Sequence, residues 1–335
     1  MQAAPEKTPA PLPLPGIVPA LVRGFNIAAA NVHLVLLPVM LDALLWLGPR
    51  LGVEQVLTPA LSYVSTNLLK AAQPAQVEAV NTALELLQTS ISQFNLVNLL
   101  STFPVGVPAL TPMAETAATP YGAPLVTQVG GALPLLGLTG LLIVIGWLLG
   151  SLYFGAIGRA ATESAEPFSL KAAARHFVQV AALTLMLLGL ALLVTVPGAL
   201  LVSLIAVVSP VVGQFLMFFV IFLLVWLIVP LLFAPLGIFT HQMNAITALL
   251  NSWRLTRFYL PTGGMFIMTA AVLGLGLDML WTLPEASSWL LGVGILGHAF
   301  IYTALVAAAF VYFRGGMKVM QSRQTPRPPV ERPTL

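Results

Sequence analysis

Two acidic residues and one histidine lie inside long apolar stretches of this chain, where ionisable side chains most often have a function. Asp42 falls in the apolar stretch 27–48, Asp278 in 262–283 and His298 in 288–313. An unpaired charge in the hydrocarbon of a membrane costs at least about 2.5 kcal/mol. Two carboxylates and an imidazole at one depth could relay protons or bind a cation. The first hypothesis is therefore a proton or cation site made of these three residues.

A structural role is the alternative for the same residues, and it is the one we expect. Asp42 is within two turns of the end of its apolar stretch, so its carboxylate could reach the membrane surface or meet Arg50. Asp278 could form a hydrogen bond to a neighbouring helix. A shift in the ends of the stretches would also move these residues out of the hydrocarbon.

The remaining histidines, His33, His176 and His241, show no pair with the spacing of a metal site, and we expect them to pack at the membrane interface. The chain has no cysteine, which excludes disulfides, thiolate metal sites and cysteine nucleophiles. We therefore predict no metal and no cofactor.

The composition identifies an integral membrane protein. The 335-residue chain is 58% hydrophobic and 7% charged, with a mean hydropathy of +0.95, so it has too little polar surface to enclose a water-soluble core. Crossing about 30 Å of hydrocarbon takes a helix of about 20 apolar residues. Six stretches approach that length: 27–48, 133–158, 178–203, 211–236, 262–283 and 288–313. The predicted fold class is an all-α polytopic membrane protein, with six transmembrane helices, amphipathic interfacial elbows and a helical outer cap.

The basic residues predict an orientation. Of the 14 lysines and arginines, all except Arg50 and Lys70 fall on one side of a membrane that these helices cross. Cytoplasmic segments collect Lys and Arg, so both termini are expected in the cytoplasm and the protein in a bacterial plasma membrane, the cell inner membrane. No basic cluster is interleaved with aromatic residues, so nucleic acid is not an expected partner.

The segment 49–132 is the one large piece between predicted spans. Its apolar residues recur every three or four positions over 53–68 and again over 77–94, which predicts two amphipathic helices that pack on each other or lie against the outer leaflet. The apolar stretch 96–113 is interrupted by prolines, and we expect it to be a loop resting on the helical bundle. The alternative is a segment at the membrane interface that contacts lipid.

Short amphipathic stretches precede the first, third and fifth predicted spans, around residues 17–25, 170–177 and 246–253. An apolar face with a cationic flank suits a helix in the headgroup layer, so the predicted unit is an interfacial elbow followed by a transmembrane hairpin, used three times. Basic residues at this level could bind phospholipid headgroups, although topology alone would also place them there. These candidates are Arg23, Arg159, Lys171, Arg175, Arg254 and Arg257.

Small residues predict close helix packing. Gly146, Gly150 and Gly158 lie on one face of the stretch 133–158, and such a face lets another backbone approach. We expect a contact within the chain, the alternative being a second copy of the protein.

The stretch 239–254, FTHQMNAITALLNSWR, lies between two predicted spans and resembles the elbow of a broad group of bacterial six-span membrane proteins. The group includes the membrane domain attached to some glycerophosphodiester phosphodiesterases and similar uncharacterised families. In these proteins a small residue is followed by Ser-Trp or Ser-aromatic and a basic residue, at the positions of Ala248, Ser252, Trp253 and Arg254 here. The phosphodiesterase domain itself is missing. The resemblance implies an all-helical membrane module without a settled activity.

The sequence predicts five segments. They are a proline-rich cytoplasmic N-terminus with the first elbow (1–26), the first transmembrane helix (27–48), an extracytoplasmic helical insertion (49–132), the five-helix remainder of the bundle (133–316) and a basic cytoplasmic tail expected to be disordered (317–335).

No motif of a hydrolase or ATPase is present: there is no G-x-S-x-G, no Gly-Lys-Ser/Thr phosphate loop and no H-E-x-x-H. We therefore expect a non-enzymatic accessory or scaffold protein that contacts membrane lipids, another membrane protein or a copy of itself. The alternative is a small proton- or cation-coupled transporter or channel that uses Asp42, Asp278 and His298.

Overall fold

The computed structural model describes residues 16–71, 77–110, 118–163 and 169–324; the N-terminal proline-rich stretch and the end of the basic tail lie outside them. The elements are α1 (Ile17–Ala30), η1 (Val32–Val35), α2 (Leu36–Leu47), β1 (Arg50–Gly52), α3 (Glu54–Ala71), α4 (Val77–Ser92), η3 (Leu96–Leu100), β2 (Val126–Gln128), α5 (Ala132–Thr162), α6 (Leu170–Val208), α7 (Pro210–Ile228), η4 (Val229–Leu231), α8 (Ala234–Thr240), α9 (Ala245–Phe258), α10 (Leu260–Trp281) and α11 (Leu291–Gln324). The η elements are short 3-10 helices.

The fold is that of an all-α polytopic membrane protein. Within the described residues, five helical stretches are long and apolar enough to cross a membrane, and six if the bent pair at the N-terminus counts as one. Each keeps its backbone hydrogen bonds within the helix, as lipid surroundings require. The predicted all-α membrane fold is therefore confirmed.

The first predicted span, 27–48, is not one straight helix as expected. α1 ends at Ala30, and the following η1–α2 segment is bent from it by 92°. Asn31 terminates α1, because its backbone and side-chain amides both bond the carbonyl of Ile27. Pro38 then lies in the first turn of α2, where its missing N–H leaves no helical bond unmade. The first elbow and the first part of the predicted span are thus one helix.

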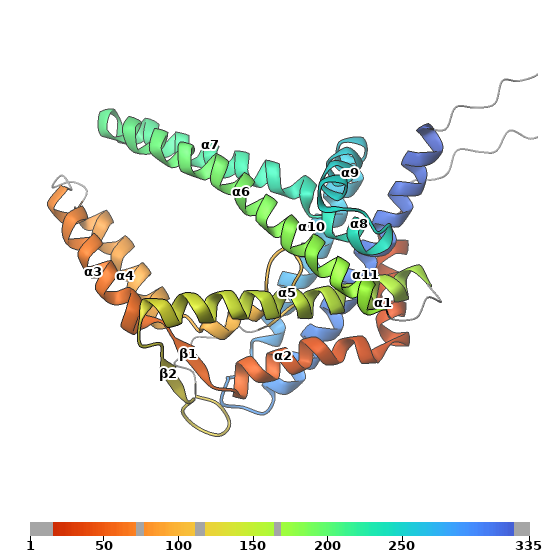
Figure 1. Cartoon of the computed structure of the whole chain (residues 1–335), viewed down its shortest axis with the longest axis horizontal. Helices are drawn as coiled ribbons and strands as arrows, with labels where there is room; N and C mark the ends of the chain where they lie inside the picture. Colours follow the sequence, from red (N-terminus) through yellow and green to blue (C-terminus); the bar gives the residue numbers. More distant parts are fainter. Residues whose placement is uncertain (1–15, 72–76, 111–117, 164–168, 325–335) are drawn as a thin grey trace, which may run out of the picture.

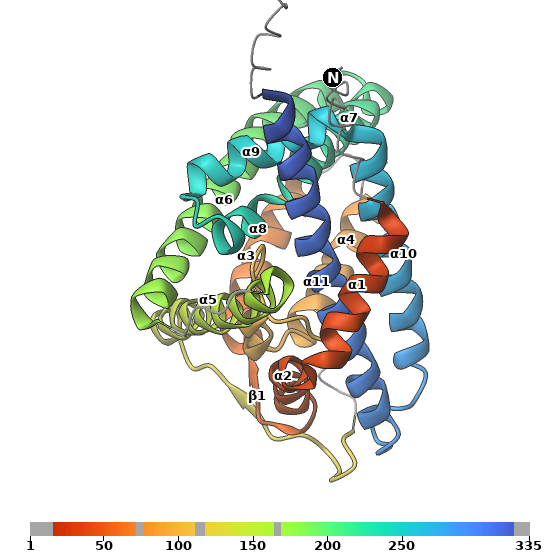
Figure 2. The same cartoon turned by 90° about the vertical axis from the view of Figure 1, so that its right-hand side faces the viewer.

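α11 is the central helix of the molecule. Of the residues in an 18-residue apolar stretch of α11, 56% are buried, whereas in the corresponding stretch of α6 the buried share is 0%. α1 and α10 lie beside it (Figure 2). The contact with α1 is very close: a Cβ added to Gly24 would lie 2.4 Å from the carbonyl oxygen of Ala304. Small residues on both helices therefore set this packing.

α6 and α7 form a long hairpin that projects from the rest of the molecule (Figure 1). Ser209 alone separates the two helices. Gly213 allows the close approach, since a Cβ there would lie 2.7 Å from the side chain of Ala206. The main packing partners of α7 are α6 and η4.

The predicted elbows differ from one another. The stretches 17–25 and 246–253 lie in helices of their own, α1 and α9, whereas 170–177 is continuous with α6. The threefold unit expected from the sequence is therefore not repeated in the structure.

The segment 49–132 contains the two predicted helices, α3 and α4, which pack on each other as a second projecting hairpin (Figure 1). Its two short strands, β1 and β2, pair in parallel and were not anticipated. Between them, η3 and the loop after it lie on α5. A Cβ on Gly146 would lie 2.8 Å from the carbonyl oxygen of Leu100, and one on Gly150 would lie 2.4 Å from that of Val105.

Leu110 attaches this loop to α2. Asp42, which is fully buried, accepts a hydrogen bond from the backbone amide of Leu110 at 2.8 Å. Trp46, one turn later, donates its indole N–H to the carbonyl of Ala286 at 2.7 Å. α2 therefore connects this loop to the α10–α11 turn.

We predict that Gly150→Ala lowers the free energy of unfolding by about 1–3 kcal/mol, because the new methyl group overlaps the Val105 carbonyl. The matched control is Gly140→Ala on the same helix, where nothing lies within 4 Å of the added atom. That change should be neutral or stabilise by up to about 1 kcal/mol through helix propensity. Thermal unfolding of the purified protein in detergent measures both; equal shifts would contradict the contact.

We also predict that Asp42→Ala lowers the free energy of unfolding by about 1–3 kcal/mol, because the Leu110 amide loses its acceptor. Asp42→Asn retains a side-chain oxygen and should cost less. Glu85→Ala, on the exposed face of α4, is the control for removal of a carboxylate. Unchanged thermal stability of Asp42→Ala would show that this hydrogen bond does not hold the loop.

Candidate functional site

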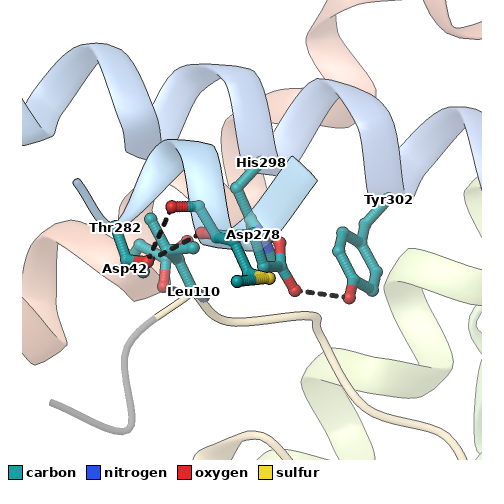
Figure 3. A network of polar contacts seen from close by, with 7 residues as sticks. Asp42, Leu110, Asp278, Thr282, His298 and Tyr302 are labelled. Atoms are coloured by element: carbon teal, nitrogen blue, oxygen red, sulfur yellow. Dashed lines mark hydrogen bonds and ion pairs between the residues drawn. The ribbon is translucent and has the colours of Figure 1, made fainter. Parts of the chain in front are cut away.

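A carboxylate, an imidazole and a phenol meet between α10 and α11 (Figure 3). Asp278 Oδ1 lies 2.8 Å from Nδ1 of His298, and the Tyr302 hydroxyl donates to Asp278 Oδ2 at 2.7 Å. The His298 and Tyr302 rings are 4.3 Å apart between centroids. The His298 side chain is 2% exposed and that of Asp278 25%. This polar cluster could pass a proton between the carboxylate and the imidazole.

Helix geometry and small residues position the polar cluster. His298 and Tyr302 are four residues apart on α11 and so share a face. Gly274, one turn before Asp278 on α10, leaves room for Tyr302, because a Cβ there would lie 3.0 Å from the phenol oxygen. Gly297 similarly accommodates the ring of Trp281. The close contact of α10 and α11 thus brings the three side chains together.

The structure pairs two of the three residues expected from the sequence. Asp278 and His298 are in direct contact, whereas Asp42 binds the loop at Leu110. Tyr302 was missed, although its spacing of four residues from His298 was a usable signal. Thr303 was also not named from the sequence; it is fully buried, and its hydroxyl lies 2.8 Å from that of Tyr153.

The six basic candidates for headgroup binding occupy different surroundings. Arg23 forms an ion pair with Glu163, and both side chains are largely exposed. Lys171 and Arg175 lie exposed on the first turns of α6. Arg254 and Arg257 line an open hollow on α9 together with Trp253 and Phe258. An exposed basic surface of this kind suits contact with anionic headgroups without selecting one.

Arg159 is placed differently. It lines a pocket of about 490 Å³ formed by α5, α6, α8 and α11, which we call the basic pocket. Its described lining residues are Gly155, Arg159, Thr162, Ser169, Ala172, His176, Phe239, Thr240, His241, Gln242 and Arg314. Burial, and next the Arg314 guanidinium, lower the pKa of His241 below its usual range.

The packing glycines make contacts within the chain. Gly146 and Gly150 face η3 and the loop after it, as described above, and Gly158 faces the ring of Phe310 and the Cβ of Phe239, 3.3–3.4 Å from an added Cβ. Among the residues that the structure describes, no three His, Asp or Glu side chains are grouped as metal ligands.

The elbow residues that resemble the six-span group have clear structural roles. Ala248 and Ser252 are fully buried on α9. The Ser252 hydroxyl donates to the carbonyl of Pro230 in η4, and Thr256 donates to the same oxygen at 3.3 Å. Trp253 packs edge-on against Trp226 of α7, with centroids 5.6 Å apart. The motif therefore joins α9 to the end of the α6–α7 hairpin.

The chain matches no family model, no curated protein and no solved structure.

Proposed function

We propose that this chain is a non-enzymatic accessory or scaffold protein of the bacterial plasma membrane that contacts another membrane protein or lipid through the α6–α7 hairpin. We infer that both termini lie in the cytoplasm. The distribution of Lys and Arg between the two sides supports this orientation.

The main support for the proposal is the exposed apolar surface of the α6–α7 hairpin. α7 exposes Phe215, Phe218, Phe219, Phe222 and Trp226, each by more than half of its surface. Of the residues of α7 only Gly213 is buried, and it faces α6. Two helices that pack mainly on each other leave their outer surfaces for neighbours in the membrane.

Aromatic side chains favour a protein partner for this surface, since they are enriched in interfaces relative to other surfaces. The hairpin is also fixed at its base. Ser252 and Thr256 bond the carbonyl of Pro230, where α7 ends. A projecting element with a fixed base suits a scaffold, which must hold its partner in one orientation.

A second candidate, proton-coupled transport, is favoured by the polar cluster alone. Asp278, His298 and Tyr302 form a continuous set of hydrogen-bonding groups within apolar helices. However, both carboxylate oxygens of Asp278 already have a partner in this cluster, His298 for one and Tyr302 for the other. A structural link between α10 and α11 accounts for the same contacts, and we favour it.

Photo-crosslinking in native membranes tests the scaffold role. We predict that a photoreactive residue at Phe222 gives a discrete adduct with one membrane protein, because this side chain is 63% exposed on the hairpin. The control position is Met268 on α10, 67% exposed and also apolar. It should give lipid adducts only. Lipid adducts alone at both positions would show that the hairpin has no protein partner and would leave lipid contact as its role.

Flux measurements in liposomes test the second candidate. We predict that the wild-type protein carries no proton flux above that of empty liposomes, and that Asp278→Asn and Tyr302→Phe change thermal stability only, because the cluster joins two helices. A pH-sensitive dye inside the liposomes reports the flux. Wild-type flux that Asp278→Asn abolishes without unfolding the protein would overturn the scaffold proposal in favour of transport.

A further inference from the structure

α9 carries two arginines, three residues apart, on its outer face. Ala248, Ser252 and Leu255 are buried where the helix packs on the rest of the molecule, whereas Arg254 and Arg257 are exposed. Residues three apart on a helix are neighbours on its surface. The two guanidinium groups therefore repel each other unless solvent screens them or an anion lies beside both.

No anion within the chain neutralises this pair. Among the residues that the structure describes, neither Arg254 nor Arg257 forms an ion pair or a hydrogen bond through its side chain. The helix itself, Ala245–Phe258, contains no Asp or Glu. Arg23, in contrast, is paired with Glu163. The two arginines of α9 are thus available to an anion from outside the chain.

Large apolar side chains are exposed on the same helix. Ile246, Leu250 and Phe258 each expose more than half of their surface, and Trp253 and Phe258 line a hollow together with the two arginines. The carbonyl end of a helix favours a cation in its last turn, which accounts for Arg257 but not for the exposed apolar groups. A face that is both apolar and cationic suits the headgroup layer of a membrane.

The position of α9 in the chain keeps it near a membrane surface. It lies between Pro210–Thr240 and Pro261–Trp281, two stretches long and apolar enough to cross a membrane. Only a few residues separate α9 from each of them, and extended chain spans at most about 3.6 Å per residue. α9 also lies beside the C-terminal part of α11 (Figure 2), where a Cβ on Gly316 would lie 2.7 Å from the side chain of Leu255.

A tryptophan pair joins this face to the apolar surface of α7. Trp253 packs edge-on against Trp226 of α7, and Trp226 is itself more than half exposed. Tryptophan is enriched at the boundary between hydrocarbon and headgroups. The arginines of α9 therefore adjoin a surface that faces the hydrocarbon, at the depth where lipid phosphates lie.

We propose that the outer face of α9 binds anionic phospholipids, with Arg254 and Arg257 on the lipid phosphates and the exposed apolar side chains among the upper parts of the acyl chains. Guanidinium groups can donate two parallel hydrogen bonds to the oxygens of a phosphate. A soluble anion would neutralise the arginines but leave the apolar side chains in water, whereas a lipid satisfies both. The inference goes beyond the scaffold role of the α6–α7 hairpin and does not depend on it.

The first test measures lipid selectivity with the full-length protein. Retention of phosphatidylglycerol over phosphatidylcholine, from an equimolar mixture in a neutral detergent, is measured by native mass spectrometry. Arg254→Gln and Arg257→Gln remove the two charges, singly and together. The matched control is Lys171→Gln, which removes one positive charge from an exposed position on α6. Thermal unfolding verifies that each variant is folded, and Arg254→Lys, which keeps the charge, should retain most of the selectivity.

We predict that the wild-type protein prefers phosphatidylglycerol and that each glutamine variant lowers this preference about fivefold, since one basic contact with an anionic lipid is lost. The double variant should lose more than either single variant, and Lys171→Gln should change the preference less than about twofold. Equal retention of the two lipids by the wild-type protein, or equal losses in Arg254→Gln and Lys171→Gln, overturns the proposal.

The second test measures the depth of α9 in a bilayer. Because the chain has no cysteine, Leu250→Cys provides a single site for a spin label in nanodiscs that contain phosphatidylglycerol. We expect dissolved oxygen, which partitions into the bilayer, to reach this label more readily than a water-soluble nickel complex. Preferential access of the nickel complex would place the face in water and overturn the proposal. Neither test bears on the crosslinking of Phe222, so the two proposals fail separately.

Discussion

The close packing of α1 on α11 is the contact on which the rest of the structure depends. In lipid there is no hydrophobic drive to bring helices together, so van der Waals packing between small residues and a few hydrogen bonds must do so. Gly24 meets the backbone at Ala304 and the methyl group of Ala308, both of which are fully buried. A larger side chain at any of these positions would separate the two helices. α11 could then no longer be surrounded by α1, α10 and α5.

Because α11 is held in this way, it contributes side chains to two chemically different places, the polar cluster and the basic pocket. His298 and Tyr302 lie in its first half and join α10, whereas Arg314 lies 16 residues after His298 and reaches the basic pocket. At 1.5 Å per residue this separation is about 24 Å along the helix. The polar cluster and the basic pocket therefore lie at different levels of one rigid element.

Much of the fold could be predicted because it follows from the length and spacing of apolar residues along the chain. Apolar length was enough to identify α5, α6, α10 and α11, and the spacing of apolar residues predicted α3 and α4. Hydropathy does not indicate the direction of a helix axis, however, so the apolar stretch 27–48 did not predict the 92° bend after α1. The candidate site was less predictable. Asp278 and His298 were named from their rarity in apolar helices, but the convergence of Arg159, His176, His241 and Arg314 depends on helices far apart in the sequence.

The elbow at α9 explains why a hairpin as apolar as α6–α7 keeps one direction. Pro230 has no N–H and so ends the helical ladder of α7, and its own carbonyl is bonded by Ser252 and Thr256. On the other side, Gln179 of α6 accepts from the first amide of α9, at Ala245, at 2.8 Å. Both arms of the hairpin are thus hydrogen-bonded to the same short helix. Ser252 is fully buried at this contact, so a larger polar side chain there would crowd the neighbouring groups. The Ser-Trp pair seen in the sequence therefore has a physical reason that is independent of any ligand: it fixes the angle at which the hairpin leaves the bundle.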